Sequence, residues 1–242
     1  MGTSEDRRRS AVVFGARNLG RAVIELLLAE GWAVAGVARS AETLAGVTAA
    51  GALAVRADVT EQASVREVLE QAAAAHGGVD LVVNAASAYG GDRTGPFGGG
   101  PIAEAAPTAY DSWAAAPARS AFTFLSASGG FLLEQGTPAT VIQVTGGSSR
   151  RASAGRGLWA AGAFGVRAIT QATALELREH GIHVALLIVD AGIQPIDDAG
   201  PVQAAAADPR TLAGAVLFLA DQGVRGATHE LQVTPLAERW VP

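Results

Sequence analysis

The feature of this sequence that most limits its fold is a regular alternation of short apolar runs with longer segments of helical apolar spacing. The short runs, rich in Val, Ile and Leu, predict strands at residues 11–14, 33–38, 52–57, 81–83, 140–144, 183–189 and 230–233. Helical spacing separates them, as at 19–30, 61–76 and 164–180. Strands that are apolar throughout are typical of a parallel sheet covered on both faces. The sequence predicts one doubly wound α/β sheet of about seven strands.

Length and the first residues set the expected domain organisation. A chain of 242 residues is long enough to bury one full α/β core, so we expect a single domain over residues 11–242. Residues 1–10, in which Glu5 and Asp6 precede three arginines, are expected to form a disordered tail. They contain no apolar stretch followed by a cleavage site, which predicts a cytoplasmic protein.

Composition excludes several functional classes. No apolar run approaches the roughly 18 residues of a membrane span, so no membrane association is expected. The net charge is -5 and no basic stripe is present, which argues against nucleic-acid binding. The chain has no Cys, and its four His residues show no ligand spacing. Disulfides, thiolate catalysis and a metal site are therefore not expected.

One segment departs from the alternation. Residues 87–107 are too rich in Gly and Pro for regular structure, and they follow a central strand of the predicted sheet. We expect a mobile loop at the carboxyl edge, where ligands bind in this architecture. A solvated insertion with no role is an equally open alternative.

The turn after the first strand suggests a dinucleotide. Gly15 and Gly20 frame the connection between the first strand and a helix that begins near Arg21, which is a Rossmann-type arrangement. Backbone amides at such a turn point toward a pyrophosphate. The alternative is that Gly15 simply provides the positive φ of a tight turn.

From about residue 11 onward the sequence resembles the short-chain dehydrogenase/reductase family. Residues 14–20 are similar to its Thr-Gly-x-x-x-Gly-x-Gly turn with one residue missing, and Asn18, which tolerates a left-handed backbone, stands at the middle Gly. Asp58-Val59 resembles the pair near the adenine, and Asn84-Ala85-Ala86 the Asn-Ala-Gly beside the ribose. The resemblance implies cofactor binding by Gly15, Arg17, Asn18, Leu19, Gly20, Arg39, Asp58, Val59, Asn84, Ala85 and Ala86.

The end of the second strand bears on the choice of cofactor. Members of the family that use NAD place an acid there, whereas this chain has Ala38 followed by Arg39. A guanidinium pairs with a 2'-phosphate, and Arg17 offers a second cation. NADP(H) is thus favoured over NAD if a dinucleotide is retained. The alternative for Arg39 is a solvated charge at a strand end.

The family's catalytic positions carry other residues. Its mechanism uses a Tyr as acid/base, a Lys four residues later, a Ser that polarises the carbonyl and an Asn that holds a relay water. Alignment places Trp159 at the Tyr, Ala163 at the Lys, Gly146 at the Ser and Pro117 at the Asn. No Lys occurs anywhere in the chain, and an indole N–H does not exchange its proton at ordinary pH. Standard Tyr-Lys chemistry is not expected, and Pro117 is expected to disturb its helix.

Three residues are candidates to replace that machinery. Asp190 leaves a buried strand at the carboxyl edge, where desolvation favours the protonated acid; a turn cap is the alternative. Tyr89, on the Gly-rich segment, is a displaced proton donor or a contact residue, and Ser148 follows the fifth strand. The expected substrate pocket is lined by Thr145, Gly146, Trp159 and Ile193.

Three functions follow from these observations. The favoured one is non-redox acid/base chemistry, such as dehydration, isomerisation or cyclisation, on an apolar small molecule. The alternatives are an NADP(H)-dependent oxidoreductase with a rearranged proton donor, and an inactive homologue that acts by partner binding. The resemblance also implies a homodimer or homotetramer formed through the helices at 113–133 and 159–180.

Overall fold

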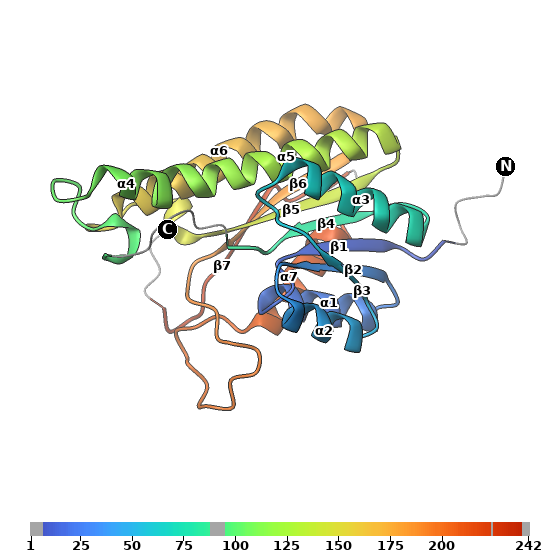
Figure 1. Ribbon diagram of the computed structural model, residues 1–242, viewed down its shortest axis with the longest axis horizontal. Coiled ribbons are helices and arrows are strands. Elements are labelled where there is room, and N and C mark those ends of the chain that lie inside the picture. The colour runs from blue at the N-terminus through green and yellow to red at the C-terminus, as the bar shows by residue number, and fades with distance from the viewer. Residues whose placement is uncertain (1–6, 88–94, 224, 239–242) are drawn as a thin grey trace.

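The computed structural model describes residues 7–87, 95–223 and 225–238, and it forms one α/β domain around a seven-stranded sheet (Figure 1). The strands run parallel in the order β3-β2-β1-β4-β5-β6-β7. Their bounds are β1 Ser10–Phe14, β2 Ala33–Ala38, β3 Leu53–Arg56, β4 Leu81–Asn84, β5 Ala139–Gly146, β6 Ile182–Val189 and β7 Glu230–Val233. The predicted doubly wound parallel sheet is confirmed.

Helices cover both faces of this sheet, as Figure 1 shows. One face carries α1 (Leu19–Ala29), α2 (Ala41–Ala49) and α7 (Pro209–Ala220), and the other carries α3 (Gln62–His76), α5 (Ala116–Gln135) and α6 (Gly157–Leu177). A short α4 (Pro107–Tyr110) and a π-helical turn (Asp111–Ala115) lead into α5. Each face of the sheet therefore has its own apolar core.

Alternate strand residues supply these two cores. In β1, Val13 faces the α1 and α7 side, while Val12 and Phe14 face the α3 and α5 side. All three side chains are almost completely buried. The Phe14 ring packs edge-on with Phe124 on α5, with 5.7 Å between the ring centroids. Burial on both faces explains why the strands read as continuous apolar runs.

The topology reverses direction between β1 and β4. The chain winds outward from β1 to β3 and then returns to build β4 to β7 on the other side. In such sheets ligands bind outside the carboxyl ends of the strands at this switch point. The candidate residues after β1, β4, β5 and β6 all belong to that edge.

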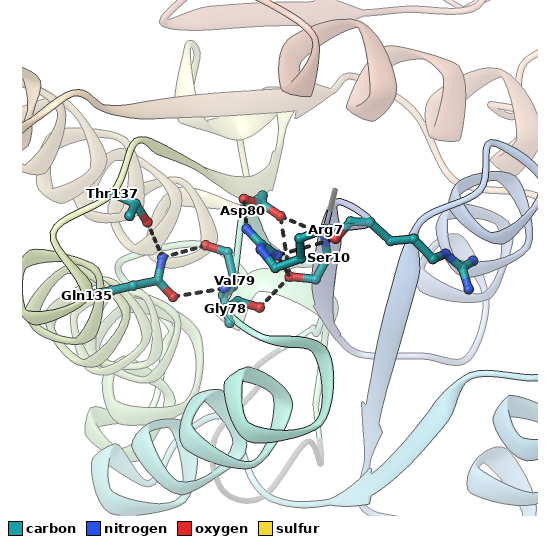
Figure 2. A network of polar contacts seen from close by, with 8 residues as sticks. Arg7, Ser10, Gly78, Val79, Asp80, Gln135 and Thr137 are labelled. Atoms are coloured by element: carbon teal, nitrogen blue, oxygen red, sulfur yellow. Dashed lines mark hydrogen bonds and ion pairs between the residues drawn. The ribbon is translucent and has the colours of Figure 1, made fainter. Parts of the chain in front are cut away.

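The opposite edge of the sheet anchors the first described residues (Figure 2). An Arg7 guanidinium nitrogen donates to Asp80 at 2.6 Å, and the Ser10 amide donates to the same carboxylate at 2.7 Å. Nearby, the Gln135 side chain bonds both the amide and the carbonyl of Val79, at 2.8 and 2.9 Å. The expected tail over residues 1–10 is thus corrected for residues 7–10, which these contacts hold; residues 1–6 lie outside the described residues.

One helix was not named from the sequence: α2 buries only Val47 and has no continuous apolar stripe. The expected disturbance of the helix at Pro117 is present. A π-helical turn over Asp111–Ala115 directly precedes it, the Ala116 amide bonds the Asp111 carbonyl, and the helical path continues through Pro117 into α5. Pro lacks an amide and crowds the preceding turn, which is why such wider turns accompany it. Across the described ranges, no helix is long and apolar enough to cross a membrane.

Candidate functional site

The turn after β1 is packed directly against the exit of β4. Gly15 has a φ of +85°, and a Cβ on it would lie 2.5 Å from the Ala86 amide nitrogen. A Cβ on Gly20 would lie 2.3 Å from the Gly15 carbonyl oxygen, so α1 also approaches the turn closely. Both glycines are therefore required by close packing, and at Gly15 the backbone conformation demands glycine as well.

The amides of this turn point inward. The amides of Gly15 and Ala16 both donate to the Val37 carbonyl, at 3.0 and 3.1 Å, and the Arg17 amide donates to the Gly15 carbonyl at 2.8 Å. The expectation that the whole turn faces a pyrophosphate is corrected for these three amides. The first turn of α1, beginning at the buried Leu19, keeps amides that have no intrahelical acceptor and can meet an anion. The Arg17 side chain is exposed.

Asn18 does something other than replace a glycine. Its φ is -95°, so it is not left-handed as the sequence suggested. Its side chain instead reaches the segment after β6: Nδ2 donates to the Gln194 carbonyl at 3.3 Å, and Oδ1 accepts from the Ile196 amide at 2.8 Å. The residue at the family's middle glycine therefore ties two loops together.

Arg39 and Asp58 meet where β2 and β3 end. The Arg39 side chain is 75% exposed and approaches Asp58 Oδ2 at 3.4 Å. The Thr60 amide and hydroxyl both donate to Asp58 Oδ1, at 3.0 and 2.8 Å. Burial opposes ionisation of Asp58, but these bonds and the Arg39 charge outweigh it and lower the pKa of Asp58. An ionised acid, an exposed guanidinium and the buried Val59 therefore share this edge.

Asn84 fixes the exit of β4. It is 2% exposed, its Nδ2 donates to Gln143 Oε1 at 3.0 Å, and its Oδ1 accepts from the Ala86 amide at 3.1 Å. The Ala85 amide donates to the Phe14 carbonyl at 2.9 Å. The sequence-predicted residues Gly15, Asn84, Ala85 and Ala86 are thus brought into one rigid corner.

The position of the family's Tyr is occupied by an aromatic cluster. The Trp159 ring centroid lies 5.5 Å from that of Phe97 and 6.2 Å from that of Trp113, and Phe97 lies 4.9 Å from Trp113. The Arg156 guanidinium lies over the Phe97 ring at 5.3 Å. Such edge-to-face packing of three rings fills space and supplies no proton donor for a carbonyl.

The Gly-rich segment delivers Phe97 to this cluster. Gly98, Gly99 and Gly100 have φ values of +82°, +90° and +77°, and a Cβ on Gly99 would lie 2.7 Å from Leu158 Cδ1. Gly98 and Gly99 therefore pack against Arg156 and Leu158 at the start of α6, while the mobility of the segment stays a prediction. Tyr89 lies outside the described residues.

The position at which the family has its Lys is buried. Ala163, one turn after Trp159, is 2% exposed. Beside it, a Cβ on Gly162 would lie 2.6 Å from the Trp113 carbonyl oxygen, so α6 packs tightly on the π turn before Pro117. This small-residue contact leaves no space for a long side chain next to Ala163.

Three hydrogen bonds hold the Asp190 carboxylate. Arg151 donates to both of its carboxylate oxygens, at 2.8 and 3.0 Å, and Gln232 Nε2 donates to Oδ2 at 3.1 Å. Asp190 is 6% exposed and lies over Gly147, where a Cβ would come within 1.8 Å of Oδ1. The geometry gives Asp190 a role in joining the exits of β5, β6 and β7; an acid/base role stays a prediction.

The remaining predicted residues divide into two groups. Thr145 and Gly146 end β5, half-buried, and Ser148 follows them in a 3₁₀ turn. Ile193 is separate: it bridges to Ala207 and packs against the core below α1 and α7. The structure thus places the first three at one strand exit and Ile193 on the opposite side of the site.

Two contributors, Phe97 and Trp113, were not predicted as site residues, and no local motif marks them, because Phe97 sits among glycines. The pairing of Arg151 with Asp190, 39 positions away, was not predicted either. The composition offers one sign of an aromatic cluster: Trp113 and Trp159 are two of only four tryptophans in the chain.

Comparison with known proteins decides the family. The family model described as short chain dehydrogenase matches residues 9–193. The chain belongs to the short-chain dehydrogenase family. A curated relative of this family, sorbitol dehydrogenase of Cereibacter sphaeroides, is 29% identical over 183 residues, which cover 74% of this chain and 68% of the relative.

Solved structures of short-chain dehydrogenases share the fold. A metagenomic short-chain oxidoreductase in complex with NADP has a TM-score of 0.72 at 24% identity, covering 95% of this chain and 98% of that one. An alcohol dehydrogenase from Thermococcus sibiricus, complexed with 5-hydroxy-NADP, has a TM-score of 0.77 at 21% identity, with coverages of 97% and 100%. Levodione reductase has a TM-score of 0.78 at 22% identity, with coverages of 94% and 96%.

Proposed function

We propose that this protein binds NADP(H) and acts as an oxidoreductase in which a Tyr-Lys pair does not deliver the proton. The observation that supports it most is the exposed Arg39 beside the ionised Asp58, at the ends of β2 and β3. A guanidinium there suits a 2'-phosphate, whereas an acid would suit free ribose hydroxyls. Two fold relatives were solved with NADP or 5-hydroxy-NADP, which is consistent with this choice.

The residues at the ends of β1 to β4 fit the adenosine end of a dinucleotide. Gly15 lets the turn approach β4, Asn84 holds that corner, and the α1 amides from Leu19 onward offer an anion site. Arg17 and Arg39 are both exposed cations of the same edge. When bound, the nicotinamide supplies or accepts the hydride.

Proton delivery is the unusual part of the proposal. The chain has no Lys, and Trp159 and Ala163 stand where the family has Tyr and Lys, so we treat the usual tetrad as lost. We propose that the Ser148 hydroxyl relays a proton from bulk water to the substrate oxygen, taking one proton from water as it gives one up, and that Thr145, Gly146 and Trp159 line the reacting end of the pocket. A well-positioned acid/base group contributes roughly 10²- to 10⁴-fold to the rate. Because the Tyr-Lys pair is missing, we expect slow turnover.

Two other functions were predicted from the sequence. The family match and the names of the relatives, which are dehydrogenases and reductases, favour an oxidoreductase over the non-redox chemistry. The inactive homologue keeps one specific observation in its favour: Phe97, Trp113 and Trp159 pack against one another at the reacting end. It would bind the nucleotide without turnover.

Calorimetric titration with NADPH and NADH, followed by a reduction assay on a panel of aldehydes and ketones, tests the proposal. We expect NADPH to bind at least tenfold more tightly than NADH, and Arg39→Ala to remove most of that difference. Ser148→Ala should lower turnover with little effect on nucleotide binding. NADPH binding with no turnover on any substrate would support the inactive homologue, and equal binding of both nucleotides would contradict the assignment of Arg39.

We also propose that the protein self-associates through α5 and α6. Large apolar side chains are exposed along these two adjacent helices, namely Phe122 at 56%, Leu133 at 41%, Phe164 at 43% and Leu175 at 66%. An exposed apolar stripe of this kind is typical of an interface between subunits.

A further inference from the structure

Residues 137–175 contain four arginines and no Asp or Glu, so the segment that runs from β5 through most of α6 is entirely cationic. Two of these arginines form ion pairs with the acid that follows β6 and with the acid of β7. Arg150 donates to the neutral side chain of Gln232 at 2.9 Å. Among the residues that the structure describes, no carboxylate lies within ion-pair distance of the fourth, Arg156. Its positive charge is therefore not offset by a neighbouring acid.

The Arg156 side chain is exposed but is packed along its length. Its guanidinium lies 5.3 Å from the centre of the Phe97 ring. A Cβ on Gly98 would lie 3.2 Å from both Cβ and Cγ of Arg156, so the stem of the side chain rests on the Gly98 backbone. A guanidinium placed over a ring face keeps N–H donors free for a further partner. The packing thus orders a cation whose donors face solvent.

Aromatic surface lies directly beside this cation. Arg156 is the residue before the first turn of α6, and Trp159 follows three positions later, a spacing that places two side chains on the same side of a helix. The Trp159 ring, half-buried, lies 5.5 Å from the Phe97 ring, which is 48% exposed. The first turn of α6 has no acidic residue that competes for the guanidinium. A cation and two partly accessible rings therefore form one surface.

This surface borders the proposed reacting end of the pocket. Trp159 belongs to both, and the turn Gly147–Ser149 that carries Ser148 packs against α6. An uncompensated positive charge at the edge of a site attracts anions and repels cations. A molecule that meets Arg156 with an anionic group can therefore place an apolar body on the rings.

We propose that Arg156 is a specificity-determining residue that binds a carboxylate, and that the substrate is an apolar carbonyl compound carrying this carboxylate, with its body packed on Phe97 and Trp159. The anion site follows from the contacts of Arg156, whereas its use by a substrate rests on the proposed function. A carboxylate fits because its two oxygens match two parallel N–H groups of a guanidinium.

Calorimetric titration with hydrocinnamate and with its uncharged amide tests the anion site without any turnover. We expect the wild-type protein to bind hydrocinnamate more tightly than the amide. Arg156→Gln should weaken hydrocinnamate about tenfold and leave the amide unchanged, because only the charge-assisted hydrogen bonds are lost. Arg156→Lys keeps the charge without the planar fork and should lose less. The matched control is Arg178→Gln, which removes an exposed guanidinium at the other end of α6 and should change neither affinity.

The outcomes separate this inference from the proposed function. Equal wild-type affinity for hydrocinnamate and the amide overturns the anion site, as do an equal loss in Arg156→Gln and Arg178→Gln and the absence of binding at millimolar concentration. NADPH-dependent reduction of phenylpyruvate and of its methyl ester tests the oxidoreductase. Hydrocinnamate binding that depends on Arg156, without reduction of either compound, keeps the anion site and removes the oxidoreductase. Faster reduction of the ester than of phenylpyruvate supports the oxidoreductase and overturns the assignment of Arg156.

Discussion

Arg151 donates hydrogen bonds to both carboxylate oxygens of Asp190, the acid that leaves β6, and the two side chains form an ion pair. Gln232 on β7 adds a third hydrogen bond, and the Arg151 side chain is itself only 28% exposed. The pair spans the exits of three neighbouring strands. Removing one partner from a nearly buried pair leaves the other charge without compensation.

Asp190→Ala should therefore lower the free energy of unfolding by about 2–4 kcal/mol, measured by urea denaturation. Asp190→Asn keeps the side chain's shape and should cost less, and adding Arg151→Met to Asp190→Ala should recover part of the loss because no charge is stranded. A loss below about 1 kcal/mol in Asp190→Ala would contradict a stabilising role for these hydrogen bonds and would favour Asp190 as an acid/base.

Phe97→Ala should loosen the aromatic cluster. It removes the ring contacts to Trp113 and Trp159, which predicts a loss of about 1–2 kcal/mol and a red shift of tryptophan fluorescence as both indoles become wetter. NADPH affinity should be unchanged, because the cluster belongs to the reacting end. Phe122→Ala on α5 is the control, with an exposed ring of similar accessibility; identical spectra for the two variants would argue against the cluster.

His183 should make stability depend on pH. Its Nε2 lies 3.0 Å from the Thr228 carbonyl, and its Nδ1 is buried. Burial first, and then the neighbouring His229, lower the pKa of His183, although hydrogen bonds to the Thr228 and Leu219 backbones favour the charged ring. The unfolded state then binds more protons, so stability is full above about pH 6.5 and falls as the pH drops through the folded pKa.

The free energy of unfolding, measured by urea denaturation in steps of roughly one pH unit between pH 7.5 and pH 5, tests this prediction. His183→Gln should flatten part of the decline. Burial also lowers the pKa of His76, on α3, so His76→Gln should flatten a separate part, and the double variant should flatten both. An unaltered slope in His183→Gln would refute the assignment.

Phe164→Glu should reduce the size of the assembly. The side chain is 43% exposed on α6, and a charge there would be buried in the proposed interface. Light scattering after size exclusion should report a monomer. Phe218→Glu, at 55% exposure on α7, is on the other face of the sheet and should leave the mass unchanged; the same mass for Phe164→Glu and wild type would rule out this face.

Most of the fold could be predicted because strands that are buried on both faces have continuous apolar sequences. Residues 33–38 and 230–233 were placed at the bounds of β2 and β7, and the predicted ends of the other strands lie within two residues of the observed ones. Helix α2 was missed for a physical reason: it buries one side chain, so no periodic apolar stripe exists to detect.

The site was predictable only where a residue acts on its own strand end. Asp58 and Asn84 lie where the sequence indicated: Asn84 is the last residue of β4, and Asp58 comes two residues after β3. Their counterparts depend on contacts far along the chain: Asn18 meets Ile196 across 178 positions, and Arg151 meets Asp190 across 39. Tertiary pairing of this kind leaves no local pattern, which is why Asn18 was expected to be a left-handed glycine substitute.

The close approach of Gly147 to Asp190 also restricts how this sequence can diverge. Any side chain at 147 would collide with the carboxylate, so the two positions are expected to covary: homologues that carry an acid at 190 should keep glycine at 147. A larger residue at 147 requires the acid at 190 to move away or to be replaced, so the two positions are coupled through this one interatomic contact.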